Sequence, residues 1–321
     1  MSKVAYFTYA QPQVIDLVAS FAPPGFEVVG RPTSVPDEEK IEIVKDADFL
    51  MLHGGRLSEA VLRAAGRVRL FQLLSAGYEN VDLALTRELG IPVAYVGGAN
   101  REGVAEMAIA LMLAVYRRLI HLDAGVRAGN WRQGLTTGFD TFELGEKTVG
   151  IVGLGRIGQM VARRLRGFDN TLLYCDVVAY PEAERELGAR RVSLDRLLKE
   201  SDVVTIHVPL LPENYGLIAE RELSLMKPTA ILVNTARGPI VDEGALIAAL
   251  KAGRIRGAGL DVFQQEPINR DNPLLALENV VLAPHAAGGT YESWPRRARF
   301  AFENFQRVME GQAPLSLVPL P

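Results

Sequence analysis

The strongest constraint on the fold is an alternation of short apolar runs with stretches of helical periodicity, which recurs along the whole chain of 321 residues. Runs such as residues 203–206 are apolar on both faces, as expected for strands covered by helices on two sides. The expected strands form two series: Val4–Tyr9, Glu27–Val29, Asp48–Leu52, Leu70–Leu74 and Val93–Tyr95, then Thr148–Val152, Thr171–Cys175, Val203–His207, Ala230–Asn234, Gly257–Leu260 and Val280–Ala283. This pattern predicts an α/β protein of two domains with parallel sheets.

A long helix is expected between the two series, from about Arg101 to Leu122. We interpret this helix as the bridge between the domains. The polar, Gly-rich stretch 125–145 follows it and contains Trp131 and Phe139. This stretch is then either an interdomain loop or an arm that grips a second subunit.

Composition narrows the class of partner. The net charge is only −3, with 23% charged and 48% hydrophobic residues, so no basic footprint for nucleic acid or an anionic membrane is expected. The single cysteine, Cys175, excludes an internal disulfide and a multi-cysteine metal site, and no metal is expected. The N-terminus lacks a signal-peptide pattern, and the most apolar helix, 104–116, is too short to span a bilayer. We expect a cytoplasmic protein with a small-molecule substrate.

The most specific motif is Gly153-Leu154-Gly155-Arg156-Ile157-Gly158. It follows an apolar strand and opens a helical run, and Asp176 stands at the end of the next strand. In a strand-turn-helix of this kind Gly153 allows the tight turn, Gly155 lets a diphosphate approach the backbone, and Gly158 lets the helix pack closely.

The helix N-terminus, which includes Arg156 and Ile157, offers N–H groups to the phosphates. Asp176 would accept hydrogen bonds from the adenosine ribose and repel a 2′-phosphate. The motif therefore predicts a dinucleotide site that prefers NAD over NADP.

Three further segments carry polar residues just after a strand. They are Asn234–Gly238, Asp261–Pro267 and Pro284–Gly289. Ligands bind outside the carboxyl ends of the strands in an open α/β sheet, so Arg237, Glu266 and His285 are expected to gather there. A histidine suits proton transfer near neutral pH, a neighbouring carboxylate orients it and favours its protonated form, and a guanidinium binds a carboxylate. This set suits the oxidation of an alcohol beside a carboxylate.

Together these segments resemble the D-isomer-specific 2-hydroxyacid dehydrogenase family, which includes glyoxylate/hydroxypyruvate reductases and D-3-phosphoglycerate dehydrogenases. The resemblance covers nearly the whole chain and is carried by Gly153–Gly158 with Asp176, His207-Val208-Pro209-Leu210, Asn234–Asp242, Asp261–Pro267 and Pro284-His285. It implies NAD-dependent hydride transfer between nicotinamide and C2 of a small D-2-hydroxy acid or 2-oxo acid. It also implies that Arg237, Glu266 and His285 are the catalytic residues.

The resemblance further implies two Rossmann-like or flavodoxin-like domains with a cleft between them. The substrate domain would comprise residues 1–99 and 293–321, and the NAD-binding Rossmann domain residues 100–292. A homodimer would form through the NAD-binding domain. The chain ends without the regulatory domain of many phosphoglycerate dehydrogenases, so control by serine is not expected.

More site residues come from the same resemblance. The backbone amides of Ser75-Ala76-Gly77 would hold the substrate carboxylate. The remaining positions would lie on the cofactor side: His207, Val208, Pro209, the Thr235-Ala236 backbone, Asp261, and Val104-Ala105-Glu106 at the start of the bridging helix.

The chain departs from many relatives in the loop after the third strand. His53-Gly54 stands where they have Arg-Ser, and because this loop faces the substrate, His53 is taken as a substrate-binding residue. The sequence therefore leaves open which 2-hydroxy acid is used, the physiological direction, and whether Trp131 and Trp294 face a ligand or only pack.

Two alternatives remain at this point. A phosphite-type dehydrogenase would resemble the chain at the Arg, Glu and His positions, whereas formate enzymes pair the histidine with Gln instead of the Glu266 found here. An NAD-sensing corepressor would share the scaffold and a similar triad, but such proteins carry extra terminal segments for their partners.

Overall fold

The computed structural model describes residues 1–131 and 140–319, and it divides the chain into two compact units. The first unit comprises residues 1–100 and 289–321, and the second comprises residues 101–288. Phe139, in the Gly-rich stretch discussed above, lies outside the described residues.

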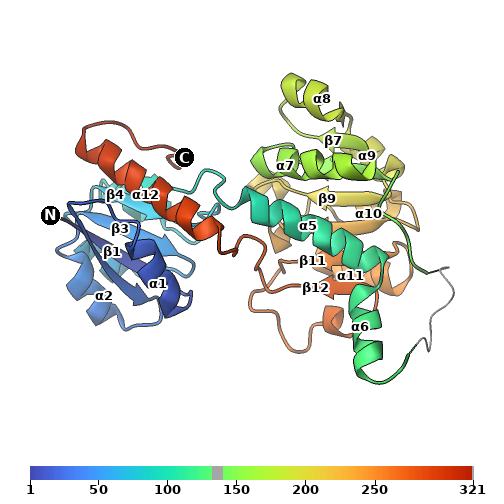
Figure 1. Ribbon diagram of the computed structural model, residues 1–321, viewed down its shortest axis with the longest axis horizontal. Helices are drawn as coiled ribbons and strands as arrows, with labels where there is room; N and C mark the ends of the chain where they lie inside the picture. The colour runs from blue at the N-terminus through green and yellow to red at the C-terminus, as the bar shows by residue number, and fades with distance from the viewer. Residues whose placement is uncertain (132–139, 320–321) are drawn as a thin grey trace. The chain divides into compact units, whose positions relative to one another are not determined.

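The first unit is a five-stranded parallel sheet covered by helices on both faces (Figure 1). Its elements are β1 Ser2–Thr8, α1 Pro12–Ala19, β2 Phe26–Pro32, α2 Asp37–Val44, β3 Phe49–His53, α3 Glu59–Ala64, β4 Leu70–Leu73, α4 Leu83–Glu88, β5 Val93–Ala94 and α12 Ser293–Met309. The strand order β2-β1-β3-β4-β5 is that of flavodoxin-like sheets. Helices α1 and α12 pack on one face, and α2, α3 and α4 on the other.

The two chain ends share this unit because the C-terminal segment packs on the sheet. A buried apolar stripe of α12 does so with Trp294, Ala298, Ala301, Phe302 and Phe305. Beyond α12, the chain forms an antiparallel bridge between Leu317 and Ala94, and Val318 N donates to Val93 O at 2.8 Å. The C-terminal segment thus covers the edge of β5.

The second unit is a seven-stranded parallel sheet. Its elements are α5 Arg101–Tyr116, α6 Leu119–Arg127, β6 Thr148–Val152, α7 Arg156–Leu165, η1 Arg166–Phe168, β7 Thr171–Cys175, α8 Pro181–Leu187, β8 Arg190–Arg191, α9 Leu194–Glu200, β9 Val203–Ile206, η2 Pro212–Asn214, α10 Glu220–Leu225, β10 Ile231–Asn234, η3 Gly238–Ile240, α11 Glu243–Lys251, β11 Gly257–Leu260, η4 Pro273–Ala276 and β12 Val280–Leu282. The order β12-β11-β10-β9-β6-β7-β8 is a Rossmann sheet with one added strand, and its order reverses between β6 and β9.

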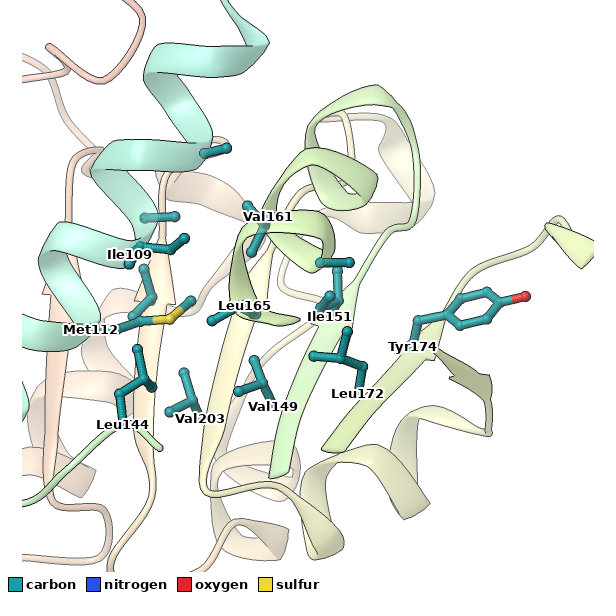
Figure 2. Packing of buried hydrophobic residues seen from close by; sticks show 14 of the residues in the cluster. Ile109, Met112, Leu144, Val149, Ile151, Val161, Leu165, Leu172, Tyr174 and Val203 are labelled. Atoms are coloured by element: carbon teal, nitrogen blue, oxygen red, sulfur yellow. The ribbon is translucent and has the colours of Figure 1, made fainter. Parts of the chain in front are cut away.

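Two apolar clusters hold this sheet. Helices α5, α7 and α8 pack on one face and α9, α10 and α11 on the other. Figure 2 shows the first cluster, where Met112 of α5 and Leu165 of α7 lie on the same side of the sheet as Val149 of β6. Because both faces are buried, the strands are apolar throughout rather than alternating.

The α/β class with two parallel sheets is confirmed, and every expected strand is present. Strand β8 was not anticipated because its two residues, Arg190 and Arg191, are exposed and give no apolar signal. Within the described ranges, no helix is both long and apolar enough to cross a membrane.

The single bridging helix expected over residues 101–122 is wrong. The structure has α5 and α6 instead, because Arg118 adopts a left-handed conformation with φ of 50° and redirects the chain. The side chain of Arg118 pairs with Asp140. Helix α5 buries much of its surface, whereas α6 buries no residue.

Candidate active site

The glycine turn after β6 is required by the fold itself at two of its three glycines. Gly153 has φ of 94° and donates its N–H to Cys175 O at 2.8 Å. A Cβ there would lie 2.8 Å from Val208 and 2.9 Å from the His207 backbone, and a Cβ on Gly158 would lie 2.1 Å from Gly153 O. Helix α7 can therefore approach β6 and β9 only with glycine at both positions.

Gly155 differs from its neighbours. Its φ is −68°, and apart from its chain neighbours and the backbone of its own helix, no atom of the described residues lies within 4 Å of the position that a Cβ would take. It precedes α7 without a side-chain cap, so the N–H groups of the first turn face open space beside the exposed Arg156. Ile157, by contrast, packs against the core. The open space before this helix N-terminus suits a diphosphate.

Asp176 is fixed beside the same turn. Its carboxylate accepts hydrogen bonds from Leu154 N at 2.8 Å and Val178 N at 3.0 Å. Arg191 of β8 donates to the main-chain oxygens of Asp176 at 2.8 Å and Val177 at 3.1 Å. The loop that would meet an adenosine ribose thus carries an acid and is held by an arginine.

His207 and Thr235 follow the adjacent strands β9 and β10, where Ile206 is paired with Asn234. His207 Nε2 lies 2.9 Å from Thr205 Oγ1. Within the described part of the chain, His207 Nδ1 and Thr235 Oγ1 are buried and make no hydrogen bond. Burial lowers the pKa of His207 to about 3, so the imidazole is neutral.

Buried polar atoms normally have partners, so these two atoms indicate a bound group that supplies them. His207 and the glycine turn flank the point where the strand order reverses, between β6 and β9, and Thr235 follows the neighbouring strand β10. These residues, with the open position at Gly155, fit a nicotinamide dinucleotide. Val208 packs against the apolar cluster beneath the turn, and Pro209 is exposed.

Glu266 and His285 form a hydrogen-bonded pair after β11 and β12. Their Oε2 and Nδ1 atoms are 2.6 Å apart, and both side chains are partly exposed. Burial alone would raise the pKa of Glu266, but the hydrogen bonds from His285 and from the Phe263 amide outweigh it. The pKa of Glu266 therefore lies below its usual value, and the carboxylate is ionised near neutral pH.

Arg237 is brought to this pair by close packing of two loops. The Asn234 side chain closes its turn by donating to Arg237 O at 2.9 Å and accepting from Ala236 N at 3.0 Å. A Cβ on Gly238 would lie 1.9 Å from the Phe263 backbone, so the loops after β10 and β11 touch. The charge of Arg237 also helps to lower the pKa of Glu266. The structure thus brings the three expected catalytic residues together.

Asp261 has a local role that the sequence did not reveal. Its buried carboxylate accepts hydrogen bonds from Ala286 N at 2.8 Å and Ala287 N at 2.9 Å, and its main-chain oxygen accepts from His285 N at 2.7 Å. Burial raises the pKa of Asp261, although the two amides oppose this shift. His285 has φ of 53°, a conformation unusual for a residue with a side chain, and Asp261 holds the loop around it.

In the first unit, the loop after β4 is closed by a hydrogen bond from Ser75 Oγ to Gly77 O at 2.8 Å. Ala76 and Gly77 are partly exposed. A small pocket of about 30 Å³ is lined by Gly54 and Gly55 on one side and by Ser75 and Gly77 on the other. This pocket joins the two loops that were expected to meet the substrate.

His53, at the end of β3, is buried in the first unit. Its Nε2 accepts from Arg297 Nη1 at 2.8 Å, and its Nδ1 lies 3.4 Å from Thr8 Oγ1. Arg297 was missed at the sequence level. The available signal was a charged residue within the apolar stripe of the last helix, between Trp294 and Ala298.

Glu106, expected beside the cofactor, pairs with Arg164 of α7 at 2.9 Å, and Glu102 does so at 2.6 Å. These contacts join α5 to α7. Among the described residues, no group of three or more side chains is arranged to hold a metal ion.

Comparisons with known proteins agree with this geometry. The sequence model of the D-isomer specific 2-hydroxyacid dehydrogenase NAD binding domain matches residues 109–287, more than half of the chain. A glyoxylate reductase from Korarchaeum cryptofilum is 44% identical over 95% of this chain and 89% of its own length. The chain belongs to the D-isomer-specific 2-hydroxyacid dehydrogenase family.

Solved structures extend the match to the full length. The TT0316 protein from Thermus thermophilus is 35% identical, with a TM-score of 0.86 over 99% of this chain and all of that one. An acyclic imino acid reductase, Bsp5, solved with NADPH and D-Arg, is 28% identical, with a TM-score of 0.83 over 99% of this chain and all of that one. The dehydrogenase is thus an oxidoreductase that interconverts 2-hydroxy and 2-oxo acids with a nicotinamide cofactor. These relatives favour neither the phosphite-type nor the corepressor alternative.

Proposed function

We propose that this dehydrogenase reduces a small 2-oxo acid to the D-2-hydroxy acid with NADH, and that Arg237, Glu266 and His285 carry the chemistry. The observation that carries the proposal is the 2.6 Å contact between Glu266 and His285 next to Arg237. Its place at the carboxyl ends of the strands is where ligands bind in such sheets. The glyoxylate reductase relative supports a small substrate.

Each residue has a distinct task in this proposal. The bound cofactor supplies the hydride that reduces C2. His285 binds Glu266 through Nδ1, so its Nε2 is the atom that gives a proton to the carbonyl oxygen. Glu266 keeps the imidazolium in place, and Arg237 polarises the carbonyl and binds the carboxylate. In the first unit, the amides of Ala76 and Gly77 are our candidates for binding the substrate carboxylate, and orienting the substrate in this way would supply part of the rate enhancement.

The proposal also covers the cofactor-binding domain and its preference for NAD. We assign residues 101–288 as the NAD-binding domain, and residues 1–100 with 289–321 as the substrate domain. Asp176 supports NAD over NADP because its carboxylate would repel a 2′-phosphate. Arg191, close to the same loop, reduces that repulsion, so discrimination should be moderate. NADPH in the Bsp5 structure is consistent with that expectation.

A homodimer through the second unit is part of the proposal. Helix α6 exposes three apolar side chains, Leu119, Ile120 and Val126, each to more than half of its area. A groove of about 660 Å³ runs between α6 and residues 275–281, and a second copy of the chain would cover this surface. Ile120→Lys should then yield a monomer in light scattering, and an unchanged mass would contradict this arrangement. The single cysteine supports a cytoplasmic location.

The test is an absorbance assay of NADH or NADPH oxidation with glyoxylate, hydroxypyruvate, pyruvate and longer 2-oxo acids. Phosphite is tested with NAD⁺. Turnover of a small 2-oxo acid with NADH supports the proposal and names the substrate. Tight NADH binding without turnover of any substrate would instead support a nucleotide-sensing role.

A further inference from the structure

The first unit presents an aromatic surface at the carboxyl ends of β1 and β3. The Tyr9 ring stacks on the His53 ring, with centroids 4.9 Å apart and planes 20° from parallel. A Cβ on Gly54 would lie 1.8 Å from the Tyr9 ring, so glycine is required for this contact. Tyr9 remains 64% exposed. In flavodoxin-like sheets the strand order reverses between these two strands, which is where ligands bind.

Beneath this surface lies a buried cation. Arg297 is 3% exposed, and its Nη1 donates to His53 Nε2 at 2.8 Å and to Leu74 O at 2.9 Å. Its guanidinium lies 4.8 Å from the Trp294 ring, and Trp294 in turn meets His53 edge-on. Burial lowers the pKa of Arg297 only to about 10, so the group is charged at neutral pH.

This arrangement fixes the tautomer of His53. A guanidinium can only donate hydrogen bonds, so His53 Nε2 must be the acceptor and its proton is on Nδ1, toward Thr8 Oγ1. A second proton on His53 would place two cations in contact. Two further cations are close to these loops: Arg296 helps to lower the pKa of Arg297, and the exposed Arg56 lies 4.0 Å from the carboxylate of Asp82.

Arg297 also links the two substrate loops. Its two hydrogen bonds join His53, before Gly54 and Gly55, to Leu74, before Ser75. The Tyr9 ring packs against Gly54, which also lines the small pocket shared with Ser75 and Gly77. A carboxylate held by the loop after β4 would place the C3 substituent of the same molecule near the loop after β3.

We propose that Tyr9 determines substrate specificity by receiving an apolar or aromatic C3 substituent of the 2-oxo acid, and that Arg297 is a positioning residue for both loops. The inference rests on the proposed function and names its substrate class. Apolar and aromatic substituents pack on the ring, whereas a second carboxylate or a phosphate loses hydration against it.

The first experiment compares kcat/KM for glyoxylate, pyruvate, phenylpyruvate and oxaloacetate in the wild type, Tyr9→Ala and Tyr9→Phe. The wild type should prefer phenylpyruvate to oxaloacetate. Tyr9→Ala should lower kcat/KM for phenylpyruvate by about tenfold or more, mainly through KM, and leave glyoxylate within about threefold. Tyr9→Phe keeps the ring and should match the wild type. An equal loss for all four substrates, or a wild-type preference for oxaloacetate, would overturn the inference.

The second experiment tests Arg297. Arg297→Met should raise KM for glyoxylate by about tenfold while the Kd for NADH stays unchanged, and Arg297→Lys, which keeps the charge, should recover part of the loss. A folded Arg297→Met enzyme with an unchanged KM would contradict the positioning role. If Arg297→Met does not fold, Arg297→Lys still tests the positioning role, and Tyr9→Ala still tests the specificity role. A wild type that reduces no 2-oxo acid would refute the proposed function itself, whereas turnover of glyoxylate with no effect of Tyr9→Ala refutes only this inference.

Discussion

The two units position their polar groups in different ways. In the second unit, partners are close in the chain and stand at the ends of nearby strands: Glu266 and His285 are 19 positions apart, and Asp176 and Leu154 are 22 apart. In the first unit, Arg297 bonds to His53 across 244 positions and to Leu74 across 223. The cofactor and acid/base groups are therefore encoded locally, whereas the Arg297 contacts beneath the aromatic surface form only after the C-terminal helix has packed on the sheet.

This difference has a functional consequence. Changes in the second unit should affect every substrate alike, because they alter the chemistry or the cofactor. Changes around Tyr9 and Arg297 should alter the ranking of substrates. The predictions below test this separation, beginning with the largest expected effect.

The acid/base pair should show the largest loss. His285→Ala should lower kcat by about 10²-fold or more for every 2-oxo acid, because the carbonyl oxygen loses its proton donor. Glu266→Gln should also lower kcat for all substrates. Glu220→Gln, an exposed carboxylate in α10, is the matched control and should match the wild type in steady-state kinetics. A His285→Ala enzyme with wild-type kcat would contradict the proton-donor role. A loss of kcat for some substrates only would contradict the separation of tasks between the two units.

The glycine turn offers a second test, because its residues serve different purposes. Gly155→Ala should leave the thermal stability unchanged, since its Cβ meets no protein atom, yet weaken NADH binding by about tenfold or more, or about 1.4 kcal/mol. Gly153→Ala should instead destabilise the fold by about 1–3 kcal/mol, because φ of 94° is strained for alanine.

Calorimetry for NADH affinity and thermal unfolding separate the two variants. Equal affinity of Gly155→Ala and the wild type would mean that the open space before α7 does not receive the diphosphate.

The same difference explains what the sequence could predict. The strands, the glycine turn and the Glu266–His285 pair were predictable because apolar runs and strand-end positions are local features. The Asp261 contacts with Ala286 and Ala287 were not, since a carboxylate in a loop gives no sign of which amides it will meet. Arg297 was missed because its function depends on His53 and Leu74, which stand at the ends of two strands more than 200 positions away. The break between α5 and α6 depends on one left-handed residue, Arg118, which has no sequence signature.

Cofactor choice should change less than catalysis. Asp176→Ala should raise the ratio of NADPH to NADH kcat/KM by about tenfold, because a charge repulsion worth about 1.4 kcal/mol is removed. Adding Arg191→Gln to this variant should lower the ratio again, since the arginine near the loop can then no longer meet a 2′-phosphate. Both ratios should be the same for glyoxylate and for a larger 2-oxo acid. A ratio that depends on the substrate would contradict the separation between the units.

The last prediction concerns the pH dependence of stability at His207, whose pKa burial lowers from 6.5 to about 3. As the pH falls below 6.5, the unfolded chain takes up a proton at this residue, but the folded protein does not do so until about pH 3. The free energy of unfolding therefore falls with pH in that window, and His207→Gln should flatten the decline between pH 6.5 and 3 without changing the slope above it. Urea unfolding at several pH values measures the slope. If the free energy of unfolding falls with pH in parallel for the wild type and His207→Gln, the folded protein accepts a proton on His207 as readily as the unfolded chain does. The buried imidazole in the wall of the cofactor site would then not be held neutral.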